Sequence, residues 1–396
     1  AIETEEEALQ FAESCGYPVM LKAAAGGGGR GMRIVRSKEE LLPQFRSARS
    51  EAAKAFGIDD IFIEKYLENP KHIEVQILGD KEGNIVHLYE RDCSIQRRHQ
   101  KVIEFTPALC LTDEQREAIC NDAIKIAQAV DYRSAGTVEF LLDKTGKHYF
   151  IEMNPRIQVE HTVSEIVTGV DIVQAQILIA QGYTLDSPEI AIPNQEAIKV
   201  TGHAIQCRIT TEDPVNGFMP DTGVIENYRS PGGFGIRLDG GNGFEGSEIT
   251  PFYDSLLVKV TAFSRTFEDT RRKAIRALRE TKIKGVKTNI MFMLNVLNHP
   301  TFAAGQCDTG FIANTPELLE IDKVEDKELK VIEFLGNKFV NETKGEKKNF
   351  NVPVFPKFKP EELKELQGRG TKQLFDEMGA KDFTQWVRRQ QRLFVT

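Results

Sequence analysis

The chain has 396 residues, of which 40% are hydrophobic, and this is enough to bury a large core. Its formal net charge of -8 argues against general nucleic-acid binding, because no excess of cations exists to displace counterions from phosphates. No apolar run is long enough to span a bilayer, and the acidic start lacks the pattern of a signal peptide. We expect a soluble protein with no nucleic-acid or membrane partner, in a bacterial cytoplasm or, alternatively, in the mitochondrial matrix.

The first part of the chain predicts a helix, a strand, a glycine loop and a second helix. Helical spacing covers residues 5–15, and a short apolar strand covers residues 17–21. Ser37 with Glu40 has the pattern of a capping box that opens a helix ending near residue 56. Alternating sequence predicts further strands at 61–65, 72–77 and 85–90, the second with one polar and one apolar face.

The middle of the chain predicts more helices and strands in mixed order. Thr112 with Gln115 is another capping-box pattern, ahead of a helix ending near residue 130. A hairpin around residues 145–146 is expected to pair 136–142 with 148–154. The remaining expected elements are one apolar helix at 163–181, strand-like sequence over 202–262, and helices at 266–280 and 288–297.

The composition changes near Asn341. A polar stretch and three prolines indicate a semi-extended linker, and a small helical piece at 371–391 follows it.

The glycine run at residues 26–29 follows a strand that ends at Lys22, and Arg30 comes next. Four glycines in a row allow the backbone to approach a ligand closely. Such a loop can lay N–H groups along phosphates, with Lys22 adding a point charge. The run matches neither the P-loop nor the GxGxxG pattern, so a flexible surface loop is the alternative.

The hairpin carries a pair of carboxylates. With residues 145–146 at the centre of the turn, Glu139 faces Glu152, and Thr137 faces Asn154. Facing like charges are destabilising unless one carboxylate holds a proton or a cation bridges the two. Two carboxylates and an amide oxygen suit Mg²⁺. The alternative is a solvated hairpin face, against which the apolar neighbours of both glutamates argue.

Polar residues occupy every second position after the hairpin. An extended chain would place five of them on one side: Glu152, Asn154, Arg156, Gln158 and Glu160. Arg156 would clamp a planar oxyanion, and Glu160 would act as a general base. An edge strand with a wet face is the alternative for any one of these residues.

The charged run at residues 90–101 reads by itself as a surface stretch that faces a phosphate or another small anion. Arg208 is a lone arginine in strand-like sequence, where a packed ion pair is the default expectation.

Four of these segments together resemble the biotin carboxylase family of ATP-grasp enzymes: Lys22-Ala23 with the glycine loop, 90–101, 150–161 and 202–208. The resemblance runs from the start of the chain to about Thr315. Further segments resemble the pyruvate carboxylase branch in particular: 218–223, 228–235, 253–259, 285–289 and the tail from Gly370. The implied fold class is α+β, with ATP-grasp subdomains followed by a linker and a small helical piece.

The resemblance implies ligands for most of the site. ATP would be bound by Lys22, Gly27, Gly28, Gly29, Glu64, Leu67, His72, Gln96 and His99. Two Mg²⁺ or Mn²⁺ ions would accompany the ATP, with Glu139, Glu152 and Asn154 as ligands. Bicarbonate would be held by Lys101, Arg156, Gln158 and Val159, with Glu160 as its base. Arg208 would stabilise the enolate-like ureido oxygen of biotin.

The resemblance also implies an organisation. It places a partial lid subdomain at 1–66, the catalytic core and C-terminal subdomain at 67–315, a helix and Pro-rich linker at 316–360, and a helical segment leading to a carboxyltransferase domain at 361–396. The family's N-terminal subdomain, carboxyltransferase domain and biotin-carrier domain would lie outside these residues. The implied partners are the biotin-carrier domain, a homotetramer built from biotin carboxylase dimers, and acetyl-CoA as an activator.

Three other functions stay open from the sequence. The chain would have the same chemistry as the biotin carboxylase component of an acyl-CoA carboxylase, and only the acceptor would differ. Another ATP-grasp ligase, forming carbamoyl phosphate, is disfavoured by the run 156–161 together with Arg208. A non-catalytic fragment that serves as a dimerisation or allosteric module is the third, and retained MgATP binding would argue against it.

Overall fold

The computed structural model describes residues 2–25, 31–241 and 243–321. The chain divides into two units, Ala1–Lys323 and Val324–Thr396, and the second lies outside the described residues. The linker and the C-terminal helical piece expected from the sequence therefore also lie outside them. The described elements mix helices and strands, which confirms the α+β prediction.

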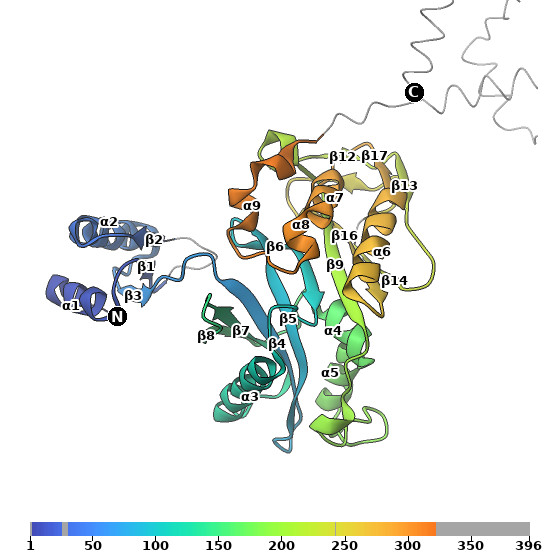
Figure 1. Cartoon of the computed structure of the whole chain (residues 1–396), viewed down its shortest axis with the longest axis horizontal. Coiled ribbons are helices and arrows are strands. Elements are labelled where there is room, and N and C mark those ends of the chain that lie inside the picture. Colours follow the sequence, from blue (N-terminus) through green and yellow to red (C-terminus); the bar gives the residue numbers. More distant parts are fainter. Residues whose placement is uncertain (1, 26–30, 242, 322–396) are drawn as a thin grey trace, which may run out of the picture. The chain divides into compact units, whose positions relative to one another are not determined.

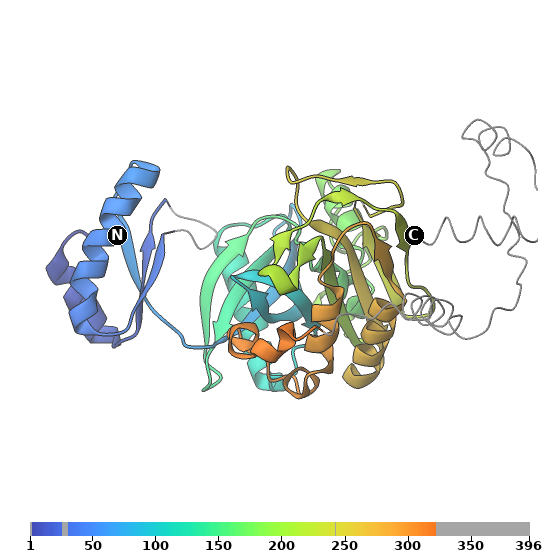
Figure 2. The same cartoon turned by 90° about the horizontal axis from the view of Figure 1, so that it is seen from above.

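The first residues form a small sheet covered by two helices. The sheet has the order β2-β1-β3, and both pairings are antiparallel. Helices α1 and α2 lie against this sheet (Figure 2). They pack on it through an apolar cluster that includes Ala8, Leu41, Phe45 and Ile61. The elements are α1 (Glu5–Cys15), β1 (Val19–Ala23), β2 (Met32–Val35), α2 (Lys38–Phe56) and β3 (Ile61–Lys65).

An eight-stranded antiparallel sheet forms the rest of the framework (Figure 1). Its strand order is β14-β16-β9-β6-β5-β4-β7-β8. The strands are β4 (Lys71–Gly79), β5 (Ile85–Arg97), β6 (Gln100–Thr106), β7 (Ser134–Leu142), β8 (His148–Asn154), β9 (His203–Thr210), β14 (Ile236–Gly240) and β16 (Leu256–Ser264). Shorter strands are β10 (Glu212–Asp213), β11 (Met219–Pro220), β12 (Gly223–Val224), β13 (Asn227–Arg229), β15 (Glu248–Ile249) and β17 (Lys282–Lys284).

Helices cover this sheet. Helix α3 packs on β4 and β7 through Ile73, Val75, Val138 and Ile119, and α6 and α7 pack on β9 and β16 through another cluster. The helices are α3 (Asp113–Ala129), α4 (His161–Thr168), α5 (Ile172–Ala180), α6 (Phe267–Glu280), α7 (Ile290–Asn298), α8 (Pro300–Ala303) and α9 (Phe311–Asn314). Short 3₁₀ turns are η1 (Gln195–Ala197), η2 (Pro214–Asn216) and η3 (Pro316–Leu319).

Strand β4 is buried along almost its whole length, which explains how a polar site can form inside the protein. Side chains alternate across a strand, so its odd-numbered residues face α3 while His72, Glu74 and Gln76 point to the other side. All three of these polar side chains are buried. The polar face of β4 thus lines the interior of the protein rather than solvent.

Two predictions about helices were wrong. The expected single helix at 163–181 is two helices, because Gly169 ends α4 in the left-handed region at φ 73° and Asp171 caps the start of α5. Ser37 is the N-cap of α2, but its side chain makes no capping hydrogen bond, and Glu40 accepts from the backbone N–H of Arg36 instead. The capping box of Thr112 and Gln115 is confirmed.

No single helix among the described residues is long and apolar enough to cross a membrane. Helices α4 and α5 together have the length and apolar composition of a membrane span, but the chain bends by 94° between them.

Gly202 should be essential for the packing of β9 on β16. It has φ +68°, and a Cβ built there would lie 2.4 Å from the backbone oxygen of Ser264. Gly169 is the matched control, since it has φ +73° but open space around its Cβ position. We expect Gly169→Ala to cost roughly 1–2 kcal/mol from backbone strain alone. Gly202→Ala should cost roughly 1–3 kcal/mol more from overpacking, measured by urea unfolding. Equal losses would contradict the close-packing argument.

Candidate active site

Arg91 occupies the centre of the sheet and is fully buried on β5. Its Nε donates to Glu74 Oε1 at 2.6 Å, and Nη1 donates to Gln76 Oε1 at 2.7 Å. It also donates to Ser164 Oγ at 3.0 Å, Thr137 Oγ1 at 3.2 Å and Gln158 Oε1 at 3.5 Å. One guanidinium therefore connects β4, β7, α4 and the loop before α4, because its fork of donors is rigid and planar.

Lys101 on β6 binds three carboxylates. Its Nζ lies 2.5 Å from Glu74 Oε2, 2.7 Å from Glu160 Oε1 and 3.0 Å from Glu139 Oε1. Burial would lower the pKa of Lys101, but the surrounding carboxylates, led by Glu74, outweigh it and raise that pKa. The ammonium is consequently held charged beneath the pocket.

The carboxylates around Lys101 are held ionised in return. Burial opposes ionisation of Glu74, but the charges of Arg91 and Lys101 outweigh it and lower its pKa to about 2. Burial likewise opposes ionisation of Glu139, while a hydrogen bond from His72 and the charge of Lys101 lower the pKa of that carboxyl.

Arg208 on β9 is held by two carboxylates. Its Nη2 donates to Glu160 Oε2 at 2.9 Å, and its Nε lies 2.5 Å from Glu104 Oε1. Glu160 is thus contacted by Lys101 on one oxygen and by Arg208 on the other. Burial raises the pKa of Glu104 to about 7, although the charge of Arg208 acts to lower it. Burial acts to lower the pKa of Arg208, but the charges of Glu104 and Glu160 outweigh it and raise that pKa.

The hairpin of β7 and β8 places Glu139 opposite Glu152 and Thr137 opposite Asn154, as predicted. The pairing of the two strands closer to the turn differs from the prediction. Near the turn Leu142 pairs with His148, one residue off the expected register, and an irregularity after Glu139 restores it. Glu152 is exposed, whereas Glu139 is 5% exposed.

This hairpin fits a divalent metal. Asn154 Nδ2 lies 3.0 Å from Glu139 Oε1 and 3.3 Å from Glu152 Oε1, so all three side chains converge. Turning the amide over would bring its oxygen to the same point as the carboxylates, and hard oxygen ligands are those that Mg²⁺ prefers. His72 Nε2 adds a nitrogen atom 2.8 Å from Glu139 Oε2.

The run after β8 is not extended, which corrects the prediction of five side chains along one strand. Strand β8 ends at Asn154, and Glu160 is the N-cap of α4 with φ -82° and ψ 4°. Gln158 and Glu160 are nevertheless buried and face the site, because the loop curls into it. His161 Nδ1 donates to the backbone oxygen of Gln158 at 2.7 Å, and Lys259 Nζ donates to the backbone oxygen of Val159 at 3.1 Å.

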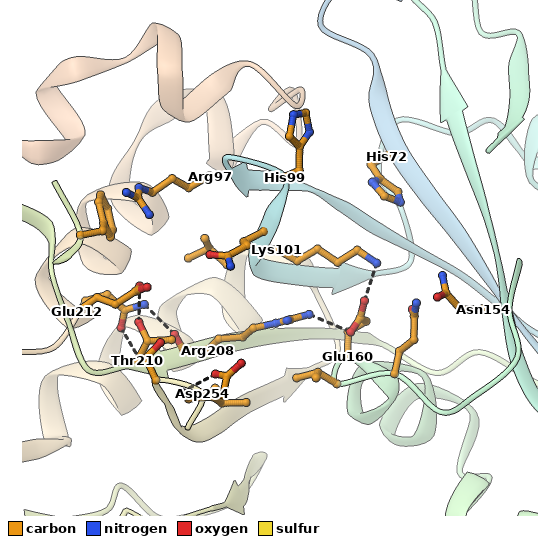
Figure 3. Close-up of a pocket in the computed structure, with 18 of the residues that line it drawn as sticks. His72, Arg97, His99, Lys101, Asn154, Glu160, Arg208, Thr210, Glu212 and Asp254 are labelled. Carbon is orange, nitrogen blue, oxygen red and sulfur yellow. Dashed lines mark hydrogen bonds and ion pairs between the residues drawn. The ribbon is translucent and has the colours of Figure 1, made fainter. Parts of the chain in front are cut away.

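Most of the predicted site residues surround one cavity of about 400 Å³ (Figure 3). Figure 3 shows Lys101 and Arg208, from the neighbouring strands β6 and β9, both reaching Glu160. Those that line the cavity are His72, His99, Lys101, Glu139, Glu152, Asn154, Arg156, Gln158, Val159, Glu160 and Arg208.

The other predicted residues either do not line this cavity or lie outside the described part of the chain. Gln96 is buried behind His72, with its Nε2 2.6 Å from His72 Nδ1. Lys22 and Glu64 form an ion pair with each other within the small N-terminal sheet, and neither they nor Leu67 lines this cavity. Gly27, Gly28 and Gly29 lie outside the described residues.

Sequence reasoning missed three buried charges: Glu74, Arg91 and Glu104. The run at 90–101 was predicted to lie at the surface, and this was wrong for its first half, since Glu90, Arg91 and Asp92 are at most 1% exposed. Residues 98–100 are exposed as predicted. A signal existed for Glu74, because the alternation at 72–77 gave it a polar face. That signal does not distinguish a wet face from a buried site.

Two family models match the chain. The model described as "Carbamoyl-phosphate synthase L chain, ATP binding domain" matches residues 1–188. The model described as "Biotin carboxylase C-terminal domain" matches residues 206–314. Pyruvate carboxylase of Bacillus subtilis is 52% identical over the whole chain. The chain spans 34% of that protein, so it covers about a third of such a curated relative.

Solved structures agree with these matches. The biotin carboxylase domain of Hydrogenobacter thermophilus 2-oxoglutarate carboxylase, a dimer in complex with MgADP, ADP and bicarbonate, is 49% identical with a TM-score of 0.75. The similarity covers 81% of this chain and 69% of that one. Rhizobium etli pyruvate carboxylase, solved with its allosteric activator acetyl coenzyme A, is 49% identical with a TM-score of 0.75, over 95% of this chain and 34% of that one.

Removing Arg91 should strongly destabilise the fold. Arg91→Met roughly keeps the volume but removes the donors to Glu74 Oε1 and Gln76 Oε1. Breaking a buried ion pair costs roughly 3–5 kcal/mol. Arg46→Met is the control, because Arg46 pairs with Glu5 at the exposed surface, and it should leave the free energy of unfolding nearly unchanged. Denaturant unfolding of both variants tests this, and a similar small effect in each would contradict the central role of Arg91.

Acid should destabilise the protein partly through Glu74. Its pKa is about 2 when folded against 4.5 for a free carboxyl, so its stabilisation is complete above pH 4.5 and is lost as the pH falls toward 2. The full difference corresponds to about 3 kcal/mol. We expect the free energy of unfolding to fall less steeply from pH 5 to pH 3 in Glu74→Gln than in the unaltered protein.

Added salt distinguishes the contribution of Glu74 to stability from that of ion pairs at the surface. Hydrogen bonds from Arg271 and Arg272 also lower the pKa of Glu268 to about 2, but Glu268 is exposed, and salt screens exposed charges. The difference between Glu74→Gln and the unaltered protein should persist in 0.5 M salt (about 4 Å screening length). Parallel pH profiles for the two proteins would show that Glu74 is not held ionised by folding.

Proposed function

The chain belongs to the biotin carboxylase family, and on that premise we propose that it carries out the ATP-dependent carboxylation of biotin by bicarbonate. The observation that carries this proposal is the buried carboxylate of Glu160, with Lys101 on one oxygen and Arg208 on the other. The cavity beside it is also lined by the converging side chains of Glu139, Glu152 and Asn154. A general base, anion-binding cations and hard oxygen ligands are the groups that this reaction needs together.

Bicarbonate would lie between the loop before α4 and Lys101. Arg156, Gln158, the backbone N–H of Val159 and Lys101 supply donors around one side of the cavity. Glu160 takes the proton of bicarbonate while a bicarbonate oxygen attacks the γ-phosphorus of ATP. The bond from that phosphorus to the bridging oxygen breaks, giving carboxyphosphate and ADP.

The nucleotide would be bound by residues from both sheets. These are Lys22, Gly27, Gly28, Gly29, Glu64, Leu67, His72, Gln96 and His99. Glu139, Glu152 and Asn154 would hold Mg²⁺ or Mn²⁺, which neutralises phosphate charge. The closed apolar cluster around Ala8, Leu41 and Ile61 supports a separate lid subdomain at 1–66. The core at 67–315, the linker at 316–360 and the helical segment at 361–396 are proposed on the family resemblance alone.

Carboxyphosphate then divides into carbon dioxide and phosphate. Phosphate removes the N1 proton of biotin, and N1 attacks carbon dioxide to give carboxybiotin. Arg208 stabilises the negative charge that develops on the ureido oxygen, which is electrostatic stabilisation at the point where charge appears.

The acceptor of the second half-reaction is proposed to be pyruvate, giving oxaloacetate, because relatives matched over the whole chain are pyruvate carboxylases. A 2-oxo acid of the 2-oxoglutarate type is the second candidate, supported by the similarity to the Hydrogenobacter enzyme. An acyl-CoA acceptor is the third. We further propose a biotin carboxylase dimer within a tetramer, a biotin-carrier partner and activation by acetyl-CoA, by analogy with the relatives.

The first experiment is fixation of labelled bicarbonate into acid-stable product by the intact protein with MgATP. Pyruvate, 2-oxoglutarate and acetyl-CoA are compared as acceptors. We expect label with pyruvate alone, and loss of about 10²–10⁴-fold in Glu160→Gln, since a general base contributes about that factor. Label with another acceptor would reassign the second half-reaction. No bicarbonate-dependent cleavage of ATP would overturn the proposed function itself.

A further inference from the structure

A chain of buried polar side chains runs behind Arg208 and has no part in the function proposed above. Glu104 on β6 lies directly opposite Gln206 on β9, and Gln206 Nε2 donates to Glu104 Oε2 at 2.8 Å. Thr162 Oγ1 on α4 donates to Gln206 Oε1 at 2.5 Å and lies 2.8 Å from Thr261 Oγ1 on β16. All four side chains have 0% exposure.

Such a chain is costly in the core of a sheet. The neighbours of Glu104 on β6 are Ile103 and Phe105, and both belong to the main apolar cluster. A buried carboxylate and amide lose hydration that apolar side chains of similar volume would not lose. The carboxyl of Glu104 even has its pKa raised by this burial. The cost of burying Glu104 is therefore offset only by the groups that it contacts, chiefly Arg208 and Gln206.

The geometry at Arg208 shows what Glu104 does. A guanidinium presents two edges to acceptors, an end edge formed by Nη1 and Nη2 and a side edge formed by Nε and Nη2. Glu104 takes Nε and Glu160 takes Nη2, so the two carboxylates together occupy that edge. Nη1 lies at the opposite corner of the planar group, so the two carboxylates contact two different nitrogens of one plane.

We propose that Glu104 is a positioning residue that fixes the guanidinium of Arg208 for its action on the carboxyl acceptor, with Gln206 and Thr162 fixing Glu104 in turn. This inference rests on the proposed function, in which Arg208 stabilises the ureido oxygen of biotin. Glu160 alone would hold Arg208 by one nitrogen and leave the plane of the guanidinium free to turn. The role belongs to the biotin step, because Lys101 and the loop before α4 serve bicarbonate.

The test separates the two steps in intact protein prepared free of biotin. Bicarbonate-dependent ATP cleavage is measured without biotin, and transfer of labelled carboxylate is measured with free biotin. Glu104→Leu should lower kcat of the biotin step roughly 10–100-fold, the range for a misplaced group, while the KM for ATP and the biotin-free cleavage stay close to those of the unaltered protein. Glu104→Gln should recover much of the loss, because it keeps the shape of the side chain and places an amide oxygen beside Arg208 Nε.

A double-mutant cycle with Arg208→Met tests whether Glu104 acts through Arg208. The variant that combines Glu104→Leu with Arg208→Met should be no slower in the biotin step than Arg208→Met alone. Additive losses would overturn the proposal, and so would an unchanged biotin step in folded Glu104→Leu. If Glu104→Leu does not fold, Gln206→Met removes the donor that fixes Glu104 and should lower the biotin step in the same direction.

Thr270→Val is the matched control. Thr270 is also fully buried, and its hydroxyl donates to the backbone oxygen of His203 on β9, away from Arg208. This variant should lose stability and keep the ratio of the two activities. A changed ratio in Thr270→Val would mean that removing any buried polar group near β9 alters the two activities in this way. That result would contradict a specific role for Glu104. Absence of bicarbonate-dependent cleavage in the unaltered protein would instead remove the proposed function.

Discussion

The structure depends on the compensation of charge inside the sheet. Four carboxylates, those of Glu74, Glu104, Glu139 and Glu160, are at most 5% exposed. Among the described residues they form ion pairs with three permanent cations, Arg91, Lys101 and Arg208. Isolated buried charges would each cost several kcal/mol, so neither set can be buried without the other. The strands that carry them must therefore stay in one register, since a slip of one residue would turn each charge to the opposite face.

The same compensation prepares the site for chemistry. Cations that are already fixed by carboxylates need little reorganisation when an anionic substrate arrives, and preorganised charge is worth more in a site that excludes water. Lys101 and Arg208 both contact Glu160, so the groups for the anion and for its proton are set by one network. His161 and Lys259 hold the loop before α4 in place by donating to the backbone oxygens of Gln158 and Val159.

The sequence predicted more of the site than of its surroundings. The pairing of Glu139 with Glu152 followed from hairpin counting, but it holds because a shifted turn and a strand irregularity cancel. Counting along Glu152 to Glu160 gave an extended run, whereas the chain curls after Asn154 and still brings Gln158 and Glu160 inward. The apolar helix at 163–181 was read as continuous, since a period of hydrophobic residues does not show that Gly169 will end it.

The sequence by itself determined the α+β class, the hairpin that pairs the carboxylates, and the set of residue types that bicarbonate and nucleotide chemistry require. It determined these because local periodicity and long motifs are properties of neighbours along the chain. Only the tertiary structure decided which charges are buried, that Arg91 joins β4, β7 and α4, and that Glu104 stands behind Arg208. Burial and ion pairing depend on residues distant in sequence, such as Glu104 and Arg208, that meet only when the strands assemble in one order.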